Sequence, residues 1–340
     1  MTTIVSKAWH RTPARTRYLW LLLLVVAALA SSVASAQYQK KPPDFGGSYS
    51  FPSATHPEPR AALIRTLDVS LLIAGLGIAA WIILKRRSRD ALLLLNIGAI
   101  AYFGFYRKGC ICPIGAIQNV TLALVDSRYM ISFGVIAFFF LPLAAALLVG
   151  RVFCGGVCLL GAIQDLVLLR SLKVPEKIDR ALSWLPYVYL GLAVWFAGWG
   201  LHLTLGTWQI QMGRRFLICE WDPFIGLFRV SGPFHMLAIG AGFILGGMFI
   251  GRPYCRWLCP YGGLLAILSR VSWKKVEITP DKETDCGLCA EACPFGAIQH
   301  LRADQATCLA CARCYMSCPQ ELERRGIPTG DGTLIQMQRP

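Results

Sequence analysis

Charged residues are scarce in this sequence. Only 16% of its 340 residues are Asp, Glu, Lys or Arg, whereas 55% are hydrophobic. That balance is typical of membrane proteins and excludes an ordinary soluble globular chain. Acidic residues are the scarcer sign, with 19 Asp and Glu against 34 Lys and Arg and a net charge of +15. The basic residues are scattered between apolar blocks, which indicates orientation in a membrane and no nucleic-acid partner.

Recognisable catalytic motifs are also missing. The sequence contains no nucleophile elbow, no catalytic triad pattern and no nucleotide-binding loop, so nothing in it indicates that the protein itself breaks substrate bonds. It does contain 14 cysteines. A chain this long and apolar does not need a secreted disulfide framework, so the spacing of the cysteines is interpreted as metal-binding.

The N-terminus has the features of a secretory signal. A basic start precedes the apolar stretch Leu19–Ala30, and Ala34-Ser35-Ala36 is typical of a cleavage site before Gln37. An uncleaved first transmembrane helix is the alternative. We therefore expect residues 1–36 to be a signal peptide and 37–66 to be a short periplasmic segment.

Five apolar segments follow, each near the length of a helix that crosses about 30 Å of hydrocarbon. They are residues 67–84, 91–106, 131–149, 185–203 and 234–250. Three shorter apolar pieces each follow a cysteine motif and suit re-entrant half-helices. They are residues 113–125, 159–169 and 260–268. The sequence predicts an α-helical, multi-pass inner-membrane domain over 67–270, with the basic loop 85–90 and everything after residue 250 in the cytoplasm.

A ferredoxin-like stretch ends the chain. Its second half, Cys308-x2-Cys311-x2-Cys314-x3-Cys318-Pro319, has the spacing of two-cluster bacterial ferredoxins. Its first half, Cys286-x2-Cys289-x3-Cys293-Pro294, lacks one cysteine, whose place falls at Glu283. Zinc or disulfides are the alternatives to clusters. Residues 271–340 are predicted to form a cytoplasmic α+β, βαββαβ-like domain and tail.

The usual exchange of the fourth ligand assigns these cysteines to two [4Fe–4S] clusters. One cluster takes Cys293, Cys308, Cys311 and Cys314. The other takes Cys286, Cys289 and Cys318, and its fourth ligand is open; Asp285 or a membrane cysteine could serve. This second cluster is predicted to be incomplete or labile.

Two matching cysteine pairs follow the third and fifth apolar segments. They are Cys154-x3-Cys158 after Gly150-Arg151 and Cys255-x3-Cys259 after Gly251-Arg252. The i, i+4 spacing would present each pair on one face of a helical turn. The four thiols are predicted to bind one further [4Fe–4S] cluster at the cytoplasmic membrane edge; a structural zinc is the alternative.

Three more cysteines map to the opposite, periplasmic face. They are Cys110, Cys112 and Cys219. They could hold a cluster together with a non-cysteine ligand, or form a disulfide in that oxidising compartment.

One pattern occurs four times. It begins at each of four cysteines: Cys112 (CPIGAIQ), Cys158 (CLLGAIQ), Cys259 (CPYGGLL) and Cys293 (CPFGAIQ). Proline can open a helix, whose N-terminus then directs amides and partial positive charge at an anionic thiolate. Glycine would let the backbone approach the cluster closely.

These motifs resemble the NosR/NapH-type membrane polyferredoxins over roughly residues 63–320. FCGGVC (153–158), YCRWLCP (254–260), RKGCICPIGAIQN (107–119) and CEWDPF (219–224) carry the resemblance. It is closest to the membrane half of NosR-like proteins, but without their periplasmic flavin domain. The resemblance implies electron transfer between the quinol pool, or a cytoplasmic donor, and a respiratory reductase system through partner electron-transfer proteins. The alternative is a redox-sensing or maturation factor for a periplasmic metalloenzyme such as nitrous oxide reductase.

Overall fold

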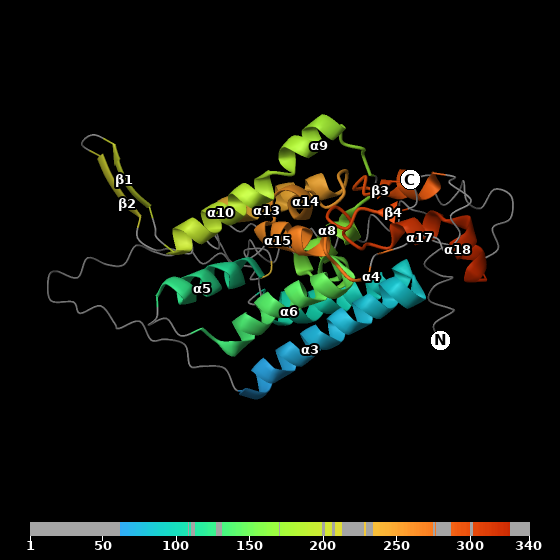
Figure 1. Ribbon diagram of the computed structural model, residues 1–340, viewed down its shortest axis with the longest axis horizontal. Helices are drawn as coiled ribbons and strands as arrows, with labels where there is room; N and C mark the ends of the chain where they lie inside the picture. The colour runs from blue at the N-terminus through green and yellow to red at the C-terminus, as the bar shows by residue number, and fades with distance from the viewer. Residues whose placement is uncertain are drawn as a thin grey trace.

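The chain folds mainly into helices that run along the long axis of the molecule (Figure 1). The computed structural model describes residues 62–107, 109, 113–126, 131–169, 171–198, 201–205, 208–212, 228, 234–274, 276, 287–299 and 302–326. The expected signal peptide lies outside the described residues, as do Cys110, Cys112, Cys219 and Cys286.

Each of the five apolar segments predicted from the sequence contains a helix. The helices are α3 (Ala62–Trp81) continued by the short π-helix η1 (Ile82–Arg86), α4 (Arg89–Ala99) continued by the π-helix η2 (Ile100–Tyr106), α6 (Phe133–Val149), α10 (Leu185–Gly198) and α13 (Phe234–Gly247). A short helix, α9 (Glu176–Leu182), precedes α10. The prediction for 185–203 was too long, because Leu201–Leu205 is strand β1, paired antiparallel with β2 (Trp208–Met212). Leu and polar residues alternate along 201–205, a period that favours a strand over a helix.

Two of the described helical stretches are long and apolar enough to cross a membrane. They are Leu63–Arg86, with 24 residues, and Lys177–Gly198, with 22. The predicted spans 131–149 and 234–250 contain shorter apolar helices, Phe133–Val149 and Met236–Gly247. Large apolar side chains on these helices are exposed, among them Leu63, Leu94, Phe133, Trp195 and Phe234. Exposed apolar surface of this extent is typical of contact with lipid or a partner.

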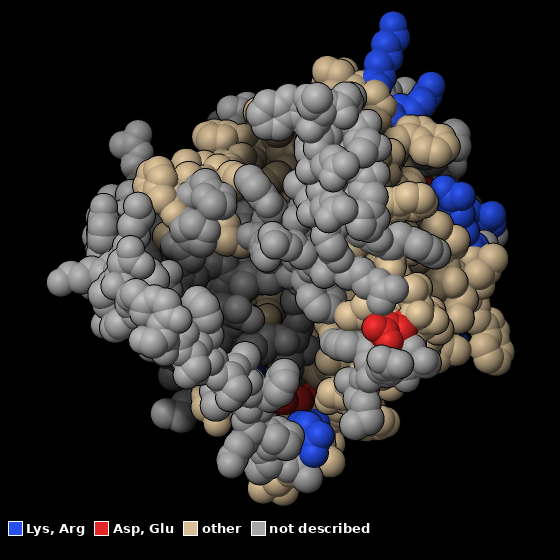
Figure 2. All heavy atoms as spheres, turned by 90° about the vertical axis from the view of Figure 1, so that its left-hand side faces the viewer, with Lys and Arg blue, Asp and Glu red and all other residues tan. Residues whose placement is uncertain are grey.

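Charged residues are few at one end of the molecule. Viewed from the end that carries β1 and β2, the described surface is mostly uncharged, with Lys and Arg side chains mainly along its upper and right-hand margins (Figure 2). At the other end, Arg87, Arg89 and Arg256 all contact the C-terminal segment. The arginines therefore gather where the apolar helices meet the ferredoxin-like stretch.

Two helical hairpins carry the paired membrane cysteines. The first joins α7 (Val152–Gly156) to α8 (Leu159–Val167), and the second joins α14 (Pro253–Trp257) to α15 (Pro260–Ser269). Short helices are therefore present in the apolar pieces 159–169 and 260–268, and α5 (Pro113–Val125) occupies the third; their re-entrant character stays a prediction. Helix α15 packs against α6, α10 and α5, which places the hairpins inside the helical bundle.

The C-terminal segment packs against the ends of α4 and α8 and repeats one motif twice. Its elements are α16 (Leu288–Ala292), β3 (Ile298–Gln299), β4 (Arg302–Ala303), α17 (Arg313–Ser317) and α18 (Pro319–Arg324). Helices α16 and α17 each start after a residue with positive φ, Gly287 at 72° and Ala312 at 60°. Each ends at an extended Cys-Pro step, at Cys293 and Cys318. Strands β3 and β4 form an antiparallel hairpin; the outer parts of the predicted βαββαβ unit lie outside the described residues.

Candidate metal centres

Four cysteines from the two hairpins line one cavity. Cys154 lies in α7 and Cys255 in α14, while Cys158 and Cys259 immediately precede α8 and α15; all four are buried. The structure thus brings together the set that the sequence pairs at a distance of about 100 residues.

The geometry of each pair differs from the predicted single helical turn. The chain leaves the helical conformation between the two cysteines, and Cys158 and Cys259 are extended, with ψ of 119° and 111°. Proline disfavours the helical conformation in the residue before it, which explains Cys259. Cys158 adopts the same conformation although Leu159 follows it, so α8 begins there without proline.

The second cysteine of each pair lies at the N-terminus of the helix it precedes. The Gly262 amide donates to Cys259 Sγ at 3.3 Å. The amides of Leu160 and Gly161 lie close enough to Cys158 to favour its thiolate, but the Cys158 side chain accepts no capping hydrogen bond. Helix N-termini favour anions, so both sulfurs are set up to carry negative charge.

The rest of the cavity wall is mostly apolar. Ile114, Phe153, Leu160 and Leu265 contribute to it, and Arg151 is the charged residue that lines it. Ile114 stands at the start of α5, so the first copy of the repeated pattern reaches this cavity as well. Such a wall excludes water and strengthens electrostatic interactions inside.

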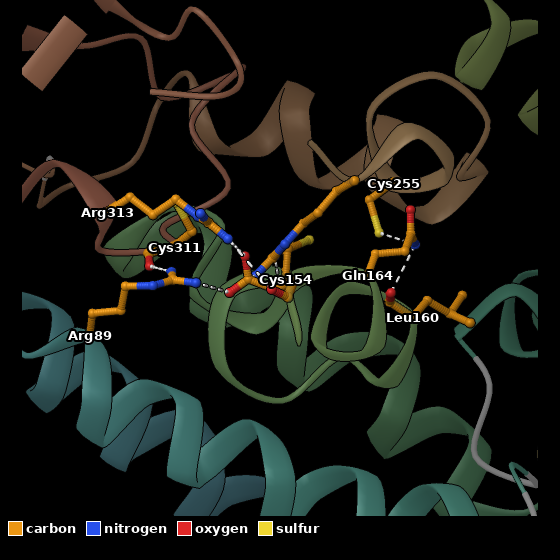
Figure 3. A network of polar contacts seen from close by, with 9 residues as sticks. Arg89, Cys154, Leu160, Gln164, Cys255, Cys311 and Arg313 are labelled. Atoms are coloured by element: carbon orange, nitrogen blue, oxygen red, sulfur yellow. Dashed lines mark hydrogen bonds and ion pairs between the residues drawn. The ribbon is translucent and has the colours of Figure 1, made fainter. Parts of the chain in front are cut away.

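Gln164, the last residue of the second copy of the pattern, ties the two hairpins together. Its Nε2 lies 3.5 Å from Cys255 Sγ and donates to the Leu160 carbonyl at 2.8 Å, while its Oε1 accepts from the Tyr254 amide at 3.1 Å. Figure 3 shows this side chain between Leu160 and Cys255. In the third copy the equivalent residue is Leu265. Its side chain has no hydrogen-bond donor, so the second hairpin has no matching contact from this position to a cysteine sulfur.

The glycines of the repeated pattern make room for arginines. A Cβ on Gly161 would lie 3.1 Å from Arg252 Nη1 and 2.6 Å from the Cys154 carbonyl oxygen. A Cβ on Gly262 would lie 3.1 Å from Arg151 Nη2. Each hairpin's glycine therefore admits the arginine of the other hairpin. Gly262 also lines the cavity, and the close approach of the glycines to a cluster stays a prediction.

A second cavity lies in the ferredoxin-like segment. Cys293, Cys308, Cys311 and Cys314 line it together, the same four that spacing assigns to one cluster. Burial raises the pKa of Cys308 to about 12, so this thiol stays protonated near neutral pH unless a cation binds it.

The remaining ferredoxin cysteines are described in part. Cys289 and Cys318 are both buried, and Cys289 packs in a small apolar cluster that Cys293 and Cys314 also contact. Cys286 lies outside the described residues, so the cluster site of Cys286, Cys289 and Cys318, and its missing fourth ligand, stay a prediction.

The loops that carry the two sets of cysteines pack tightly against each other and form a junction between the cavities. A Cβ on Gly155 would lie 2.5 Å from the Ala310 carbonyl oxygen, and one on Gly251 would lie 2.7 Å from Pro294 Cβ. Arg256 donates to the Pro294 carbonyl at 3.2 Å. Cysteines of both cavities belong to one continuous buried cluster of side chains.

A buried carboxylate at this junction was not identified from the sequence. Asp165, in α8, forms ion pairs with Arg89 at 3.2 Å, Arg252 at 3.2 Å and Arg313 at 3.1 Å. Burial alone raises the pKa of Asp165, but the three guanidiniums outweigh it and hold that pKa below its ordinary value. The feature of the sequence that could have indicated it is a single acidic residue, Asp165, within the apolar piece 159–169.

The donor sets fit iron–sulfur clusters. Within the described ranges, no group of three or more His, Cys, Asp or Glu side chains is arranged around a single metal ion. Four thiols around an apolar cavity are the donor set that a [4Fe–4S] cluster takes, and each of the two cavities provides it.

Comparison with known proteins supports the same cofactor. Two family models, both described as a 4Fe-4S binding domain, match the chain, one at residues 131–175 and 233–279 and the other at 284–299. The first therefore matches once around each cysteine hairpin. These matches identify 4Fe–4S clusters as the cofactor. No solved structure matches the chain to a comparable standard.

Several curated proteins are similar to this chain. NirI of Paracoccus denitrificans is 30% identical over 53% of the chain and 28% of NirI. YccM of Escherichia coli, to which electron transport is provisionally assigned, is 25% identical over 61% of the chain and 60% of YccM. The regulatory protein NosR of Pseudomonas aeruginosa is 25% identical over 71% of the chain and 35% of NosR. The matched regions cover less than two thirds of each of these relatives. Together with the 4Fe-4S domains, these relatives show that the chain is similar, over part of their length, to NirI, YccM and NosR and carries 4Fe–4S binding domains as its recognisable family feature.

Proposed function

We propose that this protein carries electrons between a cluster at the cytoplasmic edge of the inner membrane and clusters in its ferredoxin-like segment. The observation that carries the proposal is the pair of four-cysteine cavities on either side of one packed junction. Electron carriers need neighbouring redox groups that are held at a fixed separation and shielded from water. Two buried cavities joined by a packed junction provide the fixed separation and the shielding.

The ligands are proposed as follows. One [4Fe–4S] cluster is bound by Cys154, Cys158, Cys255 and Cys259, and another by Cys293, Cys308, Cys311 and Cys314. A further cluster uses Cys286, Cys289 and Cys318 with an open fourth position. Cys110, Cys112 and Cys219 are a candidate periplasmic-side site or disulfide.

The chain's own residues exclude water and hold the thiolates. Phe153, Leu160 and Leu265 keep the first cavity dry, and the N-termini of α8 and α15 direct amides at Cys158 and Cys259. A bound cluster supplies reversible one-electron chemistry, whose potential depends on burial, net charge and hydrogen bonds to sulfur.

The wider role follows from the topology proposed from the sequence. Five apolar helices over 67–270 cross the membrane after a cleaved signal peptide, and residues 271–340 lie in the cytoplasm. The exposed apolar side chains of α3, α6 and α13 support a lipid environment. Electrons then pass between the quinol pool, or a cytoplasmic donor, and a respiratory reductase system.

Iron and zinc analysis of anaerobically purified protein tests the proposal. Cys154→Ser, Cys158→Ser, Cys255→Ser and Cys259→Ser should each remove the same spectroscopic signal and about four irons, because one cluster needs all four thiolates. The ferredoxin-type signals should persist in these variants. Loss of zinc in place of iron, or different phenotypes for the two hairpins, would contradict a shared cluster.

A second candidate function is redox sensing or maturation of a periplasmic metalloenzyme. Two of the similar proteins are named regulatory protein NosR, and this name favours the regulatory alternative. A deletion strain separates the two roles. Normal metal content of the target enzyme with stalled quinol-dependent activity supports electron transfer, whereas accumulation of metal-free enzyme supports maturation.

A further inference from the structure

The junction between the two cavities contains more buried positive charge than negative. Asp165 is one carboxylate facing the guanidiniums of Arg89, Arg252 and Arg313. The Asp165 side chain is 1% exposed and that of Arg252 is 0% exposed, so water screens this charge poorly. Buried charge without compensation is costly, so a second source of negative charge is expected nearby.

The surplus guanidiniums are bonded to the cysteine loops of both cavities. Arg252 Nη1 donates to the carbonyl of Cys154, a residue of the first cavity. Arg89 Nη1 donates to the carbonyl of Cys311, a residue of the second, at 2.8 Å. Figure 3 shows Arg89 and Arg313 reaching the same carboxylate from α4 and from the C-terminal segment.

Arg252 is the member shared by both cavities. On one side it donates to the Cys154 carbonyl. On the other, it pairs at 3.2 Å with the same Asp165 oxygen that pairs at 3.2 Å with Arg89, the residue bonded to the Cys311 carbonyl. The nearby thiols of both cavities favour its positive charge. Arg313, by contrast, bonds Asp165 and precedes Cys314, and among the described residues it bonds none that lines the first cavity. The network around Asp165 therefore contains Arg252, which is common to both cavities, and Arg313, which belongs to the second cavity.

We propose, on the basis of the function proposed above, that the arginines held by Asp165 set the reduction potentials of the clusters in both cavities together, with Arg252 as the shared cation. Reduction of a four-thiolate cluster adds one electron and no proton, so the group becomes more negative. A buried guanidinium close to it stabilises that reduced form and raises its potential. Arg252 acts on two clusters and couples them electrostatically.

Redox titration of the full chain tests this. The protein is purified anaerobically in detergent and titrated with dithionite, and electron paramagnetic resonance follows the signals that Cys154→Ser and Cys308→Ser assign to each cavity. Arg252→Gln should lower the midpoint potential of both signals. Arg313→Gln should lower mainly that of the second cavity. Arg252→Lys, which keeps the charge, should restore most of the shift at the first cavity.

Arg87→Gln is the matched control. Arg87 pairs with Glu321 across the same junction at 3.0 Å, with side-chain exposures of 14% and 1%, close to the 13% and 1% of Arg89 and Asp165. It bonds no residue of the first cavity among the described contacts, so its loss should leave that cavity's potential unchanged. An equal shift with Arg87→Gln would show that loosened docking, and not charge, is responsible, and would overturn the inference.

The remaining outcomes also decide. Unchanged potentials in Arg252→Gln with full iron content, or a shift of one signal only, refute the shared role. If Arg252→Gln loses iron, Arg252→Lys and Arg89→Gln replace it. A potential close to wild type at the first cavity with Arg252→Lys, together with a lowered potential at the second cavity with Arg89→Gln, supports the inference, and an unchanged potential with Arg89→Gln refutes it. Failure of the proposed function is distinguishable, because wild-type protein would then lack iron at the first cavity altogether.

Discussion

Gly155→Ala should loosen the junction between the membrane hairpins and the ferredoxin-like segment. The added Cβ would lie 2.5 Å from the Ala310 carbonyl oxygen and 3.1 Å from the Leu309 carbonyl oxygen. Both neighbours are backbone atoms in the loop that carries Cys308 and Cys311, so they cannot swing aside as a flexible side chain would. Overpacking of this kind costs about 1–3 kcal/mol.

The assay is thermal unfolding in detergent, combined with limited proteolysis of residues 287–326. Gly155→Ala should lower the unfolding temperature and speed cleavage of that segment. Gly77→Ala is the control, because nothing lies within 4 Å of a Cβ there and alanine in a helix interior is favoured over glycine by roughly 0.5–1 kcal/mol. If Gly155→Ala is as stable and as protease-resistant as wild type, the close approach inferred at this junction is wrong.

Three further changes test other parts of the site. Gly161→Ala should destabilise the hairpins by about 1–3 kcal/mol, because its Cβ would lie 2.6 Å from the Cys154 carbonyl oxygen; unchanged thermal stability would contradict this. Asp165→Asn should cost about 3–5 kcal/mol by leaving buried arginines without their counter-charge, whereas Asp179→Asn, at the more exposed pair with Arg256, should cost at most about 1 kcal/mol. Glu283→Cys should increase the iron retained by the incomplete ferredoxin site, and equal iron content in wild type and variant would show that the site already has its fourth ligand.

Cysteine spacing predicted two sets of four thiols that the structure places around one cavity each. The set Cys293, Cys308, Cys311 and Cys314 follows from ferredoxin spacing alone, and the structure places these four around one cavity. The two CxxxC pairs were matched by their equal distance from an apolar segment, and they also share a cavity. Hydrophobic length likewise predicted the helices well, since a helix in an apolar run needs little tertiary information.

Long-range polar contacts could not be predicted in this way. Arg89 and Arg313 look like ordinary solvated basic residues until folding brings both to Asp165, 76 and 148 residues away along the chain. The prediction that each CxxxC pair lies on one helical turn was also wrong. The i, i+4 rule applies to a continuous helix, whereas in each pair the first cysteine lies in one helix and the second precedes the next helix. Likewise, the sequence alone could not show that Gly161 faces an arginine.

The order in which the chain is made limits when the first cavity can be filled. Cys154 and Cys158 are synthesised about 100 residues before Cys255 and Cys259, a delay of roughly 5–20 s at ordinary elongation rates of about 5–20 residues per second. Any group held by all four thiols must therefore enter after Cys259 has emerged. Packing of Pro294 on Gly251 and of Ala310 on Gly155 then covers the hairpins. Any system that delivers a group to the first cavity must therefore act after Cys259 has emerged and before the C-terminal segment packs on the hairpins.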